Sequence, residues 1–316
     1  MLAYLLRRLT FAVLLVFTVS SASLILVRLA PGDFADVQLG AGASAELKAQ
    51  TRALYGLDRS IAAQYRDWLV DAVRLDFGRS LMYGSPVSSL VRDYAANTAV
   101  LAATALALAT VVGLPLGIVS GSRRGVMPDL IRSISVVLLS APPLLTSLVL
   151  LVIAARTKWL PVGDMRSAGA VSSPTTDLLW HLIVPATALA LPIAAMFERL
   201  QSQAMAETIR QPYVIAALAR GVPRPRIVWR DALKAALRPA AAVYGVIVGS
   251  LLSGSFAVET VTSWPGLGQL MLGALRARDL YLVAGCAAAG SVFLAIGTLL
   301  SDIALFAIDP RAAEAG

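Results

Sequence analysis

Six long apolar stretches without acidic or basic side chains dominate the pattern of this chain. Each has about 19–24 residues, the length that a helix needs to cross a hydrocarbon core of about 30 Å. The stretches do not alternate between apolar and polar residues, so helices rather than strands of a barrel are expected. The predicted spans are residues 9–27, 98–120, 134–155, 178–197, 239–258 and 280–301.

The composition agrees with a membrane protein. Of the 316 residues, 58% are hydrophobic and only 15% are charged, and the mean hydropathy is +0.74, whereas soluble domains carry roughly 25% charged residues. The net charge of +8 does not indicate a nucleic-acid-binding protein, because the arginines flank apolar segments instead of forming one soluble basic face. We therefore expect an all-α polytopic membrane protein.

The first apolar stretch could be a cleaved signal peptide, because Arg7 and Arg8 precede it as a charged leader would. Its apolar run is longer than the roughly 7–15 residues of a signal peptide. A retained first span is therefore the preferred interpretation.

The arginines also predict the orientation. In a six-span arrangement Arg7, Arg8, Arg123, Arg124 and Arg132 fall on one side, as do residues 199–238 and Arg311. Basic residues in short loops mark the cytoplasmic side. We expect both termini in the cytoplasm of a bacterial inner membrane protein, and a division into residues 1–30, 31–97, 98–311 and a tail at 312–316.

Residues 31–97 form the largest expected extracytoplasmic piece. Two short amphipathic helices are predicted, at 43–55 and 61–73, and the second carries Trp68 on its apolar stripe. This piece either covers the mouth of the membrane part and receives a partner, or is only a long connector.

Small residues recur every four positions in two of the spans, an arrangement that lets helices approach closely. We expect tight packing at Gly113, Gly117 and Gly121, and again at Gly245, Gly249 and Ser253.

Prolines are expected to interrupt the third and fourth spans, because each removes a helical hydrogen bond that a neighbour or water must replace. Pro185 and Pro192 lie in the fourth span. Apolar runs without charges argue against coupling to protons or sodium, which uses carboxylates at mid-depth. The expected pathway residues are Ser140, Pro142, Pro143, Thr146, Thr187, Ser250 and Ser253.

Metal chemistry has little support in the sequence. The single cysteine, Cys286, cannot form a disulfide or a cysteine-based metal site within one chain. The single histidine, His181, is interpreted as a polar residue near a helix end, with a metal ligand or proton relay as the alternative.

The loop at 199–238 is long and basic. A short helix is predicted over 207–220, with Gly221 as its C-terminal cap, and a second helix follows over 226–237. Ile215, Leu218 and Ala219 give the first helix a small apolar face. The loop is either a plug for a groove on another protein or a solvated basic segment.

The same loop resembles the EAA coupling loop of ATP-binding-cassette (ABC) importer permeases, in particular the peptide type. The matching residues are Tyr213-Val214, then Ala217-Leu218-Ala219-Arg220-Gly221, then Arg224, Arg226, Arg230 and Pro239. Two positions depart from that pattern. Pro212 replaces an acidic residue, and Ile215 stands where a basic residue is common.

Further segments resemble the same family in order along the chain, namely Ala30-Pro31-Gly32-Asp33, Tyr55-Gly56-Leu57-Asp58-Arg59, Gln64-Tyr65, Asp76-Phe77-Gly78-Arg79-Ser80, Val258-Glu259-Thr260, Ser263-Trp264-Pro265-Gly266-Leu267-Gly268 and Asp309-Pro310-Arg311. The short N-terminus and long first external loop are similar to the B-type dipeptide or oligopeptide subunit.

The resemblance implies the type I importer fold and a permease subunit that is not itself an enzyme. It implies a second homologous permease, two ATPase subunits that hold ATP and Mg²⁺, and an external solute-binding protein, with no cofactor on this chain. Peptide is the default solute, and nickel, heme and glycosides remain open. The implied coupling residues are Tyr213, Ala216, Ala217, Ala219, Arg220, Gly221, Pro223, Arg224 and Arg226.

A second implied site lies outside the membrane. The expected gate or docking residues are Trp68, Glu259, Trp264, Pro265 and Gly266, with an anchor at the lipid interface as the alternative for Trp264. A secondary transporter and a scaffold subunit without transport remain as other classes. A secondary transporter would need ion-coupling groups at mid-membrane.

Overall fold

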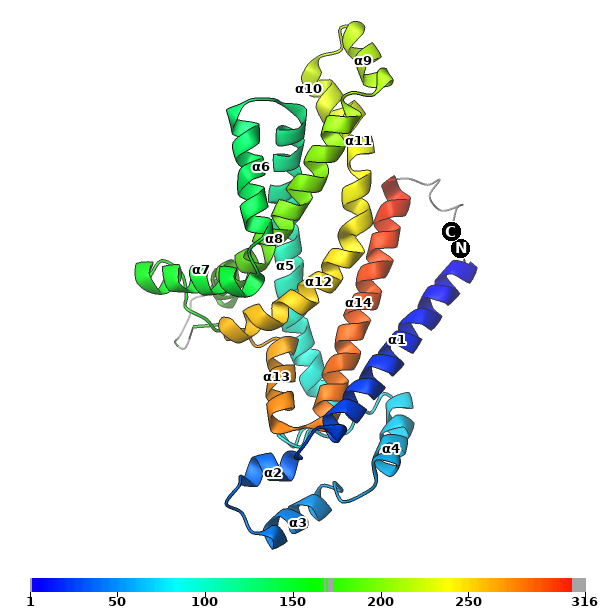
Figure 1. The fold of residues 1–316 in the computed structure, drawn as a ribbon, viewed down its shortest axis with the longest axis vertical. Coiled ribbons are helices and arrows are strands. Elements are labelled where there is room, and N and C mark those ends of the chain that lie inside the picture. Colours follow the sequence, from blue (N-terminus) through cyan, green and yellow to red (C-terminus); the bar gives the residue numbers. More distant parts are fainter. Residues whose placement is uncertain (1, 168, 170–172, 309–316) are drawn as a thin grey trace. The chain divides into compact units, whose positions relative to one another are not determined.

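The computed structural model describes residues 2–167, 169 and 173–308, and helices account for most of them (Figure 1). The helices belong to two compact units. The first comprises Met1–Ala99 and Pro265–Ala295, and the second comprises Val100–Trp264 and Ile296–Gly316. Residues 31–97 share a unit with the first helix and with the segment that follows Trp264.

The first unit consists mainly of short helices between long ones. Its elements are α1 (Leu2–Leu29), α2 (Phe34–Leu39), α3 (Ala45–Leu54), α4 (Ile61–Val73), the start of α5 (Val87–Ser122), α13 (Leu267–Ala277) and most of α14 (Leu280–Ile308). The helices predicted at 43–55 and 61–73 are thus confirmed as α3 and α4. Each begins after a serine, Ser44 or Ser60, whose hydroxyl accepts a hydrogen bond from the backbone of the first turn.

The apolar stripe of α4 packs into the first unit. Trp68 is buried in a cluster with Leu24, Phe34 and Leu57, while Ile61 at the start of the stripe stays partly exposed. The hydroxyl of Tyr65 lies 3.0 Å from the hydroxyl of Ser21 on α1. The stripe therefore attaches α4 to α1 and is not a free surface.

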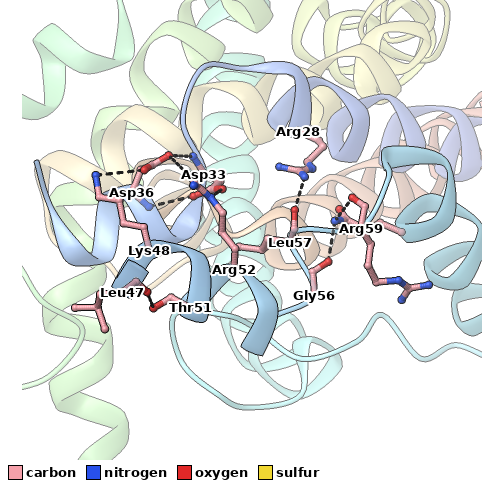
Figure 2. A network of polar contacts seen from close by, with 11 residues as sticks. Arg28, Asp33, Asp36, Leu47, Lys48, Thr51, Arg52, Gly56, Leu57 and Arg59 are labelled. Atoms are coloured by element: carbon pink, nitrogen blue, oxygen red, sulfur yellow. Dashed lines mark hydrogen bonds and ion pairs between the residues drawn. The ribbon is translucent and has the colours of Figure 1, made fainter. Parts of the chain in front are cut away.

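A network of charged side chains ties the segment after α1 together (Figure 2). Asp33 caps α2, and the Arg52 guanidinium on α3 donates to Asp33 at 2.6 Å and to Asp36 at 2.8 Å. Arg28 donates to the carbonyl of Leu57 at 2.6 Å. The pKa of Asp36 lies below its ordinary value, first because its carboxylate accepts a hydrogen bond from the Asp33 backbone, and then because of the positive charges of Arg52 and Lys48.

A buried carboxylate holds a second part of the first unit. Asp279 is fully buried and accepts hydrogen bonds from the hydroxyl of Ser80 at 2.6 Å and the backbone N–H of Met82 at 3.0 Å. Its other oxygen accepts from the N–H of Leu282 at 3.1 Å, in the first turn of α14. The Asp279 carboxylate therefore connects the turn around Ser80 to the start of α14.

The second unit is built around one long helix. Its elements are the rest of α5, α6 (Val126–Leu139), α7 (Pro143–Thr157), α8 (Pro174–Thr208), α9 (Pro212–Ala219), α10 (Arg224–Arg226), the π-helix η1 (Ile227–Ala232), α11 (Leu233–Ala236), α12 (Arg238–Val261) and the end of α14. Helix α8 contacts α6, α7, α11 and α12, and Phe197 on α8 lies in the main apolar cluster of the unit.

The glycines that recur every four residues in α5 pack closely against a neighbouring helix, as predicted. A Cβ atom built on Gly113 would lie 2.4 Å from the carbonyl oxygen of Ala194, and one on Gly121 would lie 2.3 Å from that of Ser202. A Cβ on Gly117 would meet the Glu198 carbonyl at 2.6 Å. Only glycine permits this approach of α5 to the backbone of α8. The predicted close packing at Gly245 and Gly249 remains a prediction.

The two spans that contain prolines behave differently from each other. The third is broken, since α6 ends at Leu139, α7 begins at Pro143, and their axes differ by 104°. The fourth is not interrupted, because α8 continues through Pro185 and Pro192. Our expectation of a break there was wrong. The carbonyl that Pro192 leaves without its helical donor belongs to Ala188, and the Thr146 hydroxyl lies 3.1 Å from it.

The part of the chain that the structure describes has between four and six candidate spans, and the six predicted spans are the upper limit of that range. Four helices, α1, α5, α8 and α14, are long and apolar enough to cross a membrane, and there are six candidates if each bent pair counts as one span. The second pair joins Arg224–Ala236 to Arg238–Leu251 at 52°. The expected fold class, an all-α polytopic membrane protein, is confirmed.

Candidate functional site

The candidate coupling loop lies between α8 and α12, and its helices gather beyond the end of α8 at the top of Figure 1. Helix α8 ends at Thr208 and α9 begins at Pro212. Proline suits the first position of a helix because a backbone N–H at that position has no partner within the helix, so proline loses no hydrogen bond there. The predicted helix over 207–220 is therefore two helices with a turn at 209–211, and Pro212 starts the second one.

The C-terminus of α9 has the predicted glycine cap. Gly221 has a positive φ of 80°, and its N–H donates to the Leu218 carbonyl at 2.9 Å. The next N–H, of Val222, donates to Ala217 at 3.2 Å. These two bonds form a Schellman motif, and Val222 packs on the cluster of Val214, Ala217 and Ile227. The position of Gly221 thus sets the direction in which the chain leaves α9.

Helix α9 is apolar on two faces. Val214 and Ala217 are buried against Ile227 of the π-helix. Ile215 is 55% exposed and Leu218 is 43% exposed, and Ala219 next to them is also exposed. The predicted stripe of Ile215, Leu218 and Ala219 therefore exists and has no cover within the described part of the chain. Tyr213, Ala216 and Arg220 are exposed as well.

The segment after α9 is anchored by one arginine. Pro223 precedes α10, and the Arg224 guanidinium donates to the carbonyl of Ser122, at the end of α5, at 3.2 Å. Arg226 is exposed. The helix predicted over 226–237 is present as the continuous segment Arg224–Ala236, which consists of α10, the π-helix η1 and α11, before α12 starts at a bend. Trp229 on the π-helix is half exposed, and the sequence analysis did not single it out.

A chain of polar contacts beside the loop was also not predicted. Glu198 on α8 is buried, and the Ser120 hydroxyl on α5 donates to its carboxylate. The carbonyl of Ser120 accepts a hydrogen bond from Arg132 on α6, and Arg132 donates to Asp129 at 3.0 Å. The relevant signal in the sequence was a glutamate at the end of an apolar span beside a glycine-rich helix.

Two of the predicted pathway residues contact neighbouring helices, and the pathway itself remains a prediction. Thr146 joins α7 to α8 through the carbonyl of Ala188, and Pro143 lies near the Cβ position of Gly254 on α12, at 3.6 Å. Ser140 and Ser250 bond to carbonyls of their own helices. Pro142 precedes α7 as its N-cap, and Thr187 on α8 is half-buried. The side chain of Ser253 lies outside the described residues.

The predicted external residues fall into both units. Trp68, Pro265 and Gly266 belong to the first, where the Pro265 carbonyl accepts a hydrogen bond from the Asn97 side chain at 2.8 Å and Gly266 precedes α13. Glu259 and Trp264 belong to the second unit and are fully buried. Trp264 lies in the apolar cluster of that unit, which does not fit the alternative interpretation as an anchor at the lipid interface, and the gate or docking role remains a prediction.

Metal-binding residues do not cluster in the part of the chain that the structure describes. Groups of three or more His, Cys, Asp or Glu side chains that could hold an ion are absent there. His181 is buried on α8, where its Nδ1 lies 2.9 Å from the backbone carbonyl of Asp177 and 3.4 Å from its carboxylate. His181 is therefore a packed residue with a local partner.

Comparison with known proteins assigns the family. Residues 113–314 match the family described as binding-protein-dependent transport system inner membrane component, and residues 1–114 match the N-terminal membrane component of the same systems. A provisionally named peptide permease protein of Brucella ovis is 35% identical over 98% of this chain and 99% of its own length. The oligopeptide transport system permease protein AppB of Bacillus subtilis is 29% identical over 98% of this chain and 99% of its own. The protein belongs to the family of inner membrane components of binding-protein-dependent transport systems, the permeases of ABC importers.

Proposed function

We propose that this chain forms, with a second homologous permease, the pathway by which an ABC importer carries peptides or a related solute across the inner membrane. The relatives from Brucella ovis and Bacillus subtilis are named for peptide and oligopeptide transport. Their similarity extends over nearly the whole chain, which supports the same class of solute here.

ATP binding and hydrolysis are assigned to separate subunits. The sequence contains no Gly-x-x-x-x-Gly-Lys loop, and no lysine directly follows a glycine. Such a loop is the usual way to surround nucleotide phosphates with backbone N–H groups. ATP and Mg²⁺ belong on two partner ATPases, and this chain is the part that they move.

The observation that carries the proposal is that α9 has one buried and one exposed apolar face. One face of this helix is fixed to the chain through Val214 and Ala217, while the neighbouring face leaves Ile215 and Leu218 exposed. Arginines follow at positions 220 and 226. An exposed apolar face with a polar rim is typical of a protein interaction site. We assign this face to a groove on the ATPase.

The mechanism follows from how α9 is attached. Its buried face packs on Ile227, and Arg224 connects the segment after it to the end of α5. A push on α9 is therefore transmitted to α5 and, through η1 and α11, to α12. Closure of the ATPase pair would rotate these helices as a rigid body between inward-open and outward-open states.

The orientation follows from the same assignment. Contact with cytoplasmic ATPases requires α9 and the arginines of 199–238 to face the cytoplasm, which agrees with the positive-inside rule. Six spans then place both termini in the cytoplasm and residues 31–97 outside. The external solute-binding protein would deliver its solute on that outer side.

Purification of the tagged chain from its native membrane tests the proposal. We expect two ATPase subunits, a second permease and a solute-binding protein by mass spectrometry, together with ATP hydrolysis that rises when the solute-loaded binding protein is added. A chain that purifies without any ATPase, under conditions that retain other membrane complexes, would contradict the assignment.

A further inference from the structure

A cavity of about 860 Å³ lies beside the coupling loop, within the second unit. It is bounded by the turn after α5, by α6, by the last turns of α8 and by Arg224. This volume is within the range of roughly 300–1,000 Å³ that is typical of small-molecule sites. The cavity is separate from the exposed face of α9, because neither Ile215 nor Leu218 lines it.

The lining of this cavity is strongly basic. Glu198 is its only carboxylate, and the buried Glu198 side chain already accepts a hydrogen bond from Ser120. Six guanidinium groups against one carboxylate leave a large excess of positive charge within one cavity. The arginines that line it are Arg123, Arg124, Arg132, Arg199, Arg210 and Arg224.

Two of these arginines are held in place and can still bind a ligand. Arg132 donates to the Ser120 carbonyl and to Asp129, and Arg224 donates to the Ser122 carbonyl. A guanidinium has five N–H donors, so each retains free donors. Arginine is the side chain best suited to bind phosphate oxygens in pairs.

The other four arginines carry charge that no ion pair among the described residues neutralises. Within the described residues, ion pairs to Arg123, Arg124, Arg199 and Arg210 are absent. Like charges gathered around one cavity repel one another, and a bound anion relieves that repulsion. The cavity is therefore suited to an anion with several oxygens.

An apolar surface continues from the basic cavity. Val136 on α6 lines the cavity and is 53% exposed. Leu130, Ile134 and Val137 on the same helix are also exposed, and α6 belongs to one of the candidate membrane spans. A free phosphate would use only the arginines, whereas a phospholipid has a charged head for the cavity and acyl chains for α6.

We propose that this cavity binds the phosphate headgroup of an anionic phospholipid, with the acyl chains of the lipid along the exposed face of α6. Basic pockets between membrane helices on the cytoplasmic side are suited to such headgroups. The bound lipid would join the turn after α5 to α8 and to Arg224, and so would stabilise the base of the coupling loop.

The first test measures lipid retention by the full chain in detergent. Native mass spectrometry with phosphatidylglycerol, and separately with phosphatidylcholine, compares the wild type with Arg123→Gln/Arg124→Gln. We expect retention of phosphatidylglycerol over phosphatidylcholine, and an apparent affinity at least about tenfold weaker in the variant. Arg199→Gln/Arg210→Gln provides a second pair on a different helix, and size-exclusion chromatography confirms that both variants are folded.

The matched control is Arg230→Gln/Lys234→Gln. It removes two exposed charges from the same loop region, and neither residue lines the cavity. This control should keep the wild-type affinity. Equal loss in the control and in the cavity variants would overturn the proposal, because the lipid would then bind by general charge alone. Retention unchanged in both cavity variants would overturn it as well.

Two further measurements separate the lipid from other occupants. Millimolar inorganic phosphate should not displace phosphatidylglycerol, and displacement would indicate a site for a free anion. In the assembled transporter, Arg124→Cys provides an accessible thiol, since Cys286 is buried, and it can carry a photo-crosslinker. A phospholipid adduct supports the proposal, whereas an adduct with an ATPase subunit would show that protein fills the cavity.

Discussion

The hydroxyl of Thr146 on α7 lies 3.1 Å from the carbonyl oxygen of Ala188 on α8, which is the carbonyl that Pro192 leaves without a helical donor. The same hydroxyl lies 2.9 Å from the carbonyl of Pro143 and 3.3 Å from that of Pro142, so its single proton is shared among these carbonyls. Such a contact lets a proline remain inside a continuous membrane helix. It also connects α7 to α8 in the first turn of α7, just after the 104° bend between α6 and α7.

Replacement of Thr146 tests this relationship. Thr146→Val keeps the shape of the side chain and removes the donor, so the Ala188 carbonyl loses its partner in an apolar environment. We expect a loss of about 1–2 kcal/mol of stability, seen as a lower Tm in detergent. Thr146→Ser keeps the hydroxyl and should restore most of the Tm. Equal behaviour of the valine and serine variants would show that the hydrogen bond contributes nothing.

The contact of α5 with α8 makes a second prediction. Gly117→Ala places a Cβ about where the Glu198 carbonyl and the Gln201 Cβ already lie, each at 2.6 Å. We expect the helices to separate at a cost of about 1–3 kcal/mol. Gly290→Ala on α14 is the matched control, because its added Cβ meets nothing within 4 Å, and alanine favours a helix by up to about 1 kcal/mol. A variant at Gly117 as stable as the one at Gly290 would refute the packing argument.

The buried carboxylate of Asp279 should contribute strongly to stability, because three hydrogen-bond donors share it. Asp279→Ala leaves the Ser80 hydroxyl and the N–H groups of Met82 and Leu282 without their acceptor. We expect a loss of about 3 kcal/mol or more, and faster hydrogen exchange in the first turn of α14. Ser80→Ala removes one of these three contacts and the hydrogen bond that the Ser80 hydroxyl accepts from the Tyr83 N–H at 3.0 Å, and it should cost less, about 1–2 kcal/mol. If the two variants were equally stable, Asp279 would not be the common anchor.

The network around Asp36 predicts a dependence on pH. The pKa of Asp36 is lowered in the folded protein, so its charged form contributes stability above the unfolded pKa of about 3.9. That contribution is lost as the pH falls through the lower, folded pKa. We expect the hydrogen-exchange protection of α2 and α3, corrected for intrinsic rates, to fall below about pH 4. Asp36→Asn should show weaker protection at neutral pH and less change with acid, and an unchanged profile would contradict this account.

The sequence was sufficient to locate the four long helices that can each cross a bilayer, because length and apolarity alone determine that ability, but it did not show the size of the bend in the third predicted span or the bend just before the fifth. It also predicted the tight helix contact at Gly113, Gly117 and Gly121 and the cap at Gly221. In both cases the prediction depends only on glycine lacking a side chain, which permits close approach of a helix or a positive φ. The division into two units could not be read in the same way. It depends on contacts between distant segments, such as the one between Ser80 and Asp279.

The interpretations that the structure does not support share a physical cause. Pro192 does not interrupt α8, because Thr146 from another helix replaces the lost donor. Trp264 is buried, because the chain turns back at Ser263 and places the indole in the apolar core instead of at a surface. In both cases a local rule was overridden by a partner far away in the sequence. The two apolar faces of α9 also became distinct only once the position of Ile227 was known.

Substitution on the exposed face of α9 tests most directly whether this loop couples the permease to its ATPases. Ile215→Glu with Leu218→Glu places charges on that face and leaves Val214 and Ala217 packed. We expect the ATPase subunits to be lost from the purified complex and hydrolysis to stop responding to the solute-loaded binding protein. Leu54→Glu, an exposed leucine on α3, should retain the ATPases. A double variant with a full complement of ATPase and wild-type stimulation would contradict the central claim.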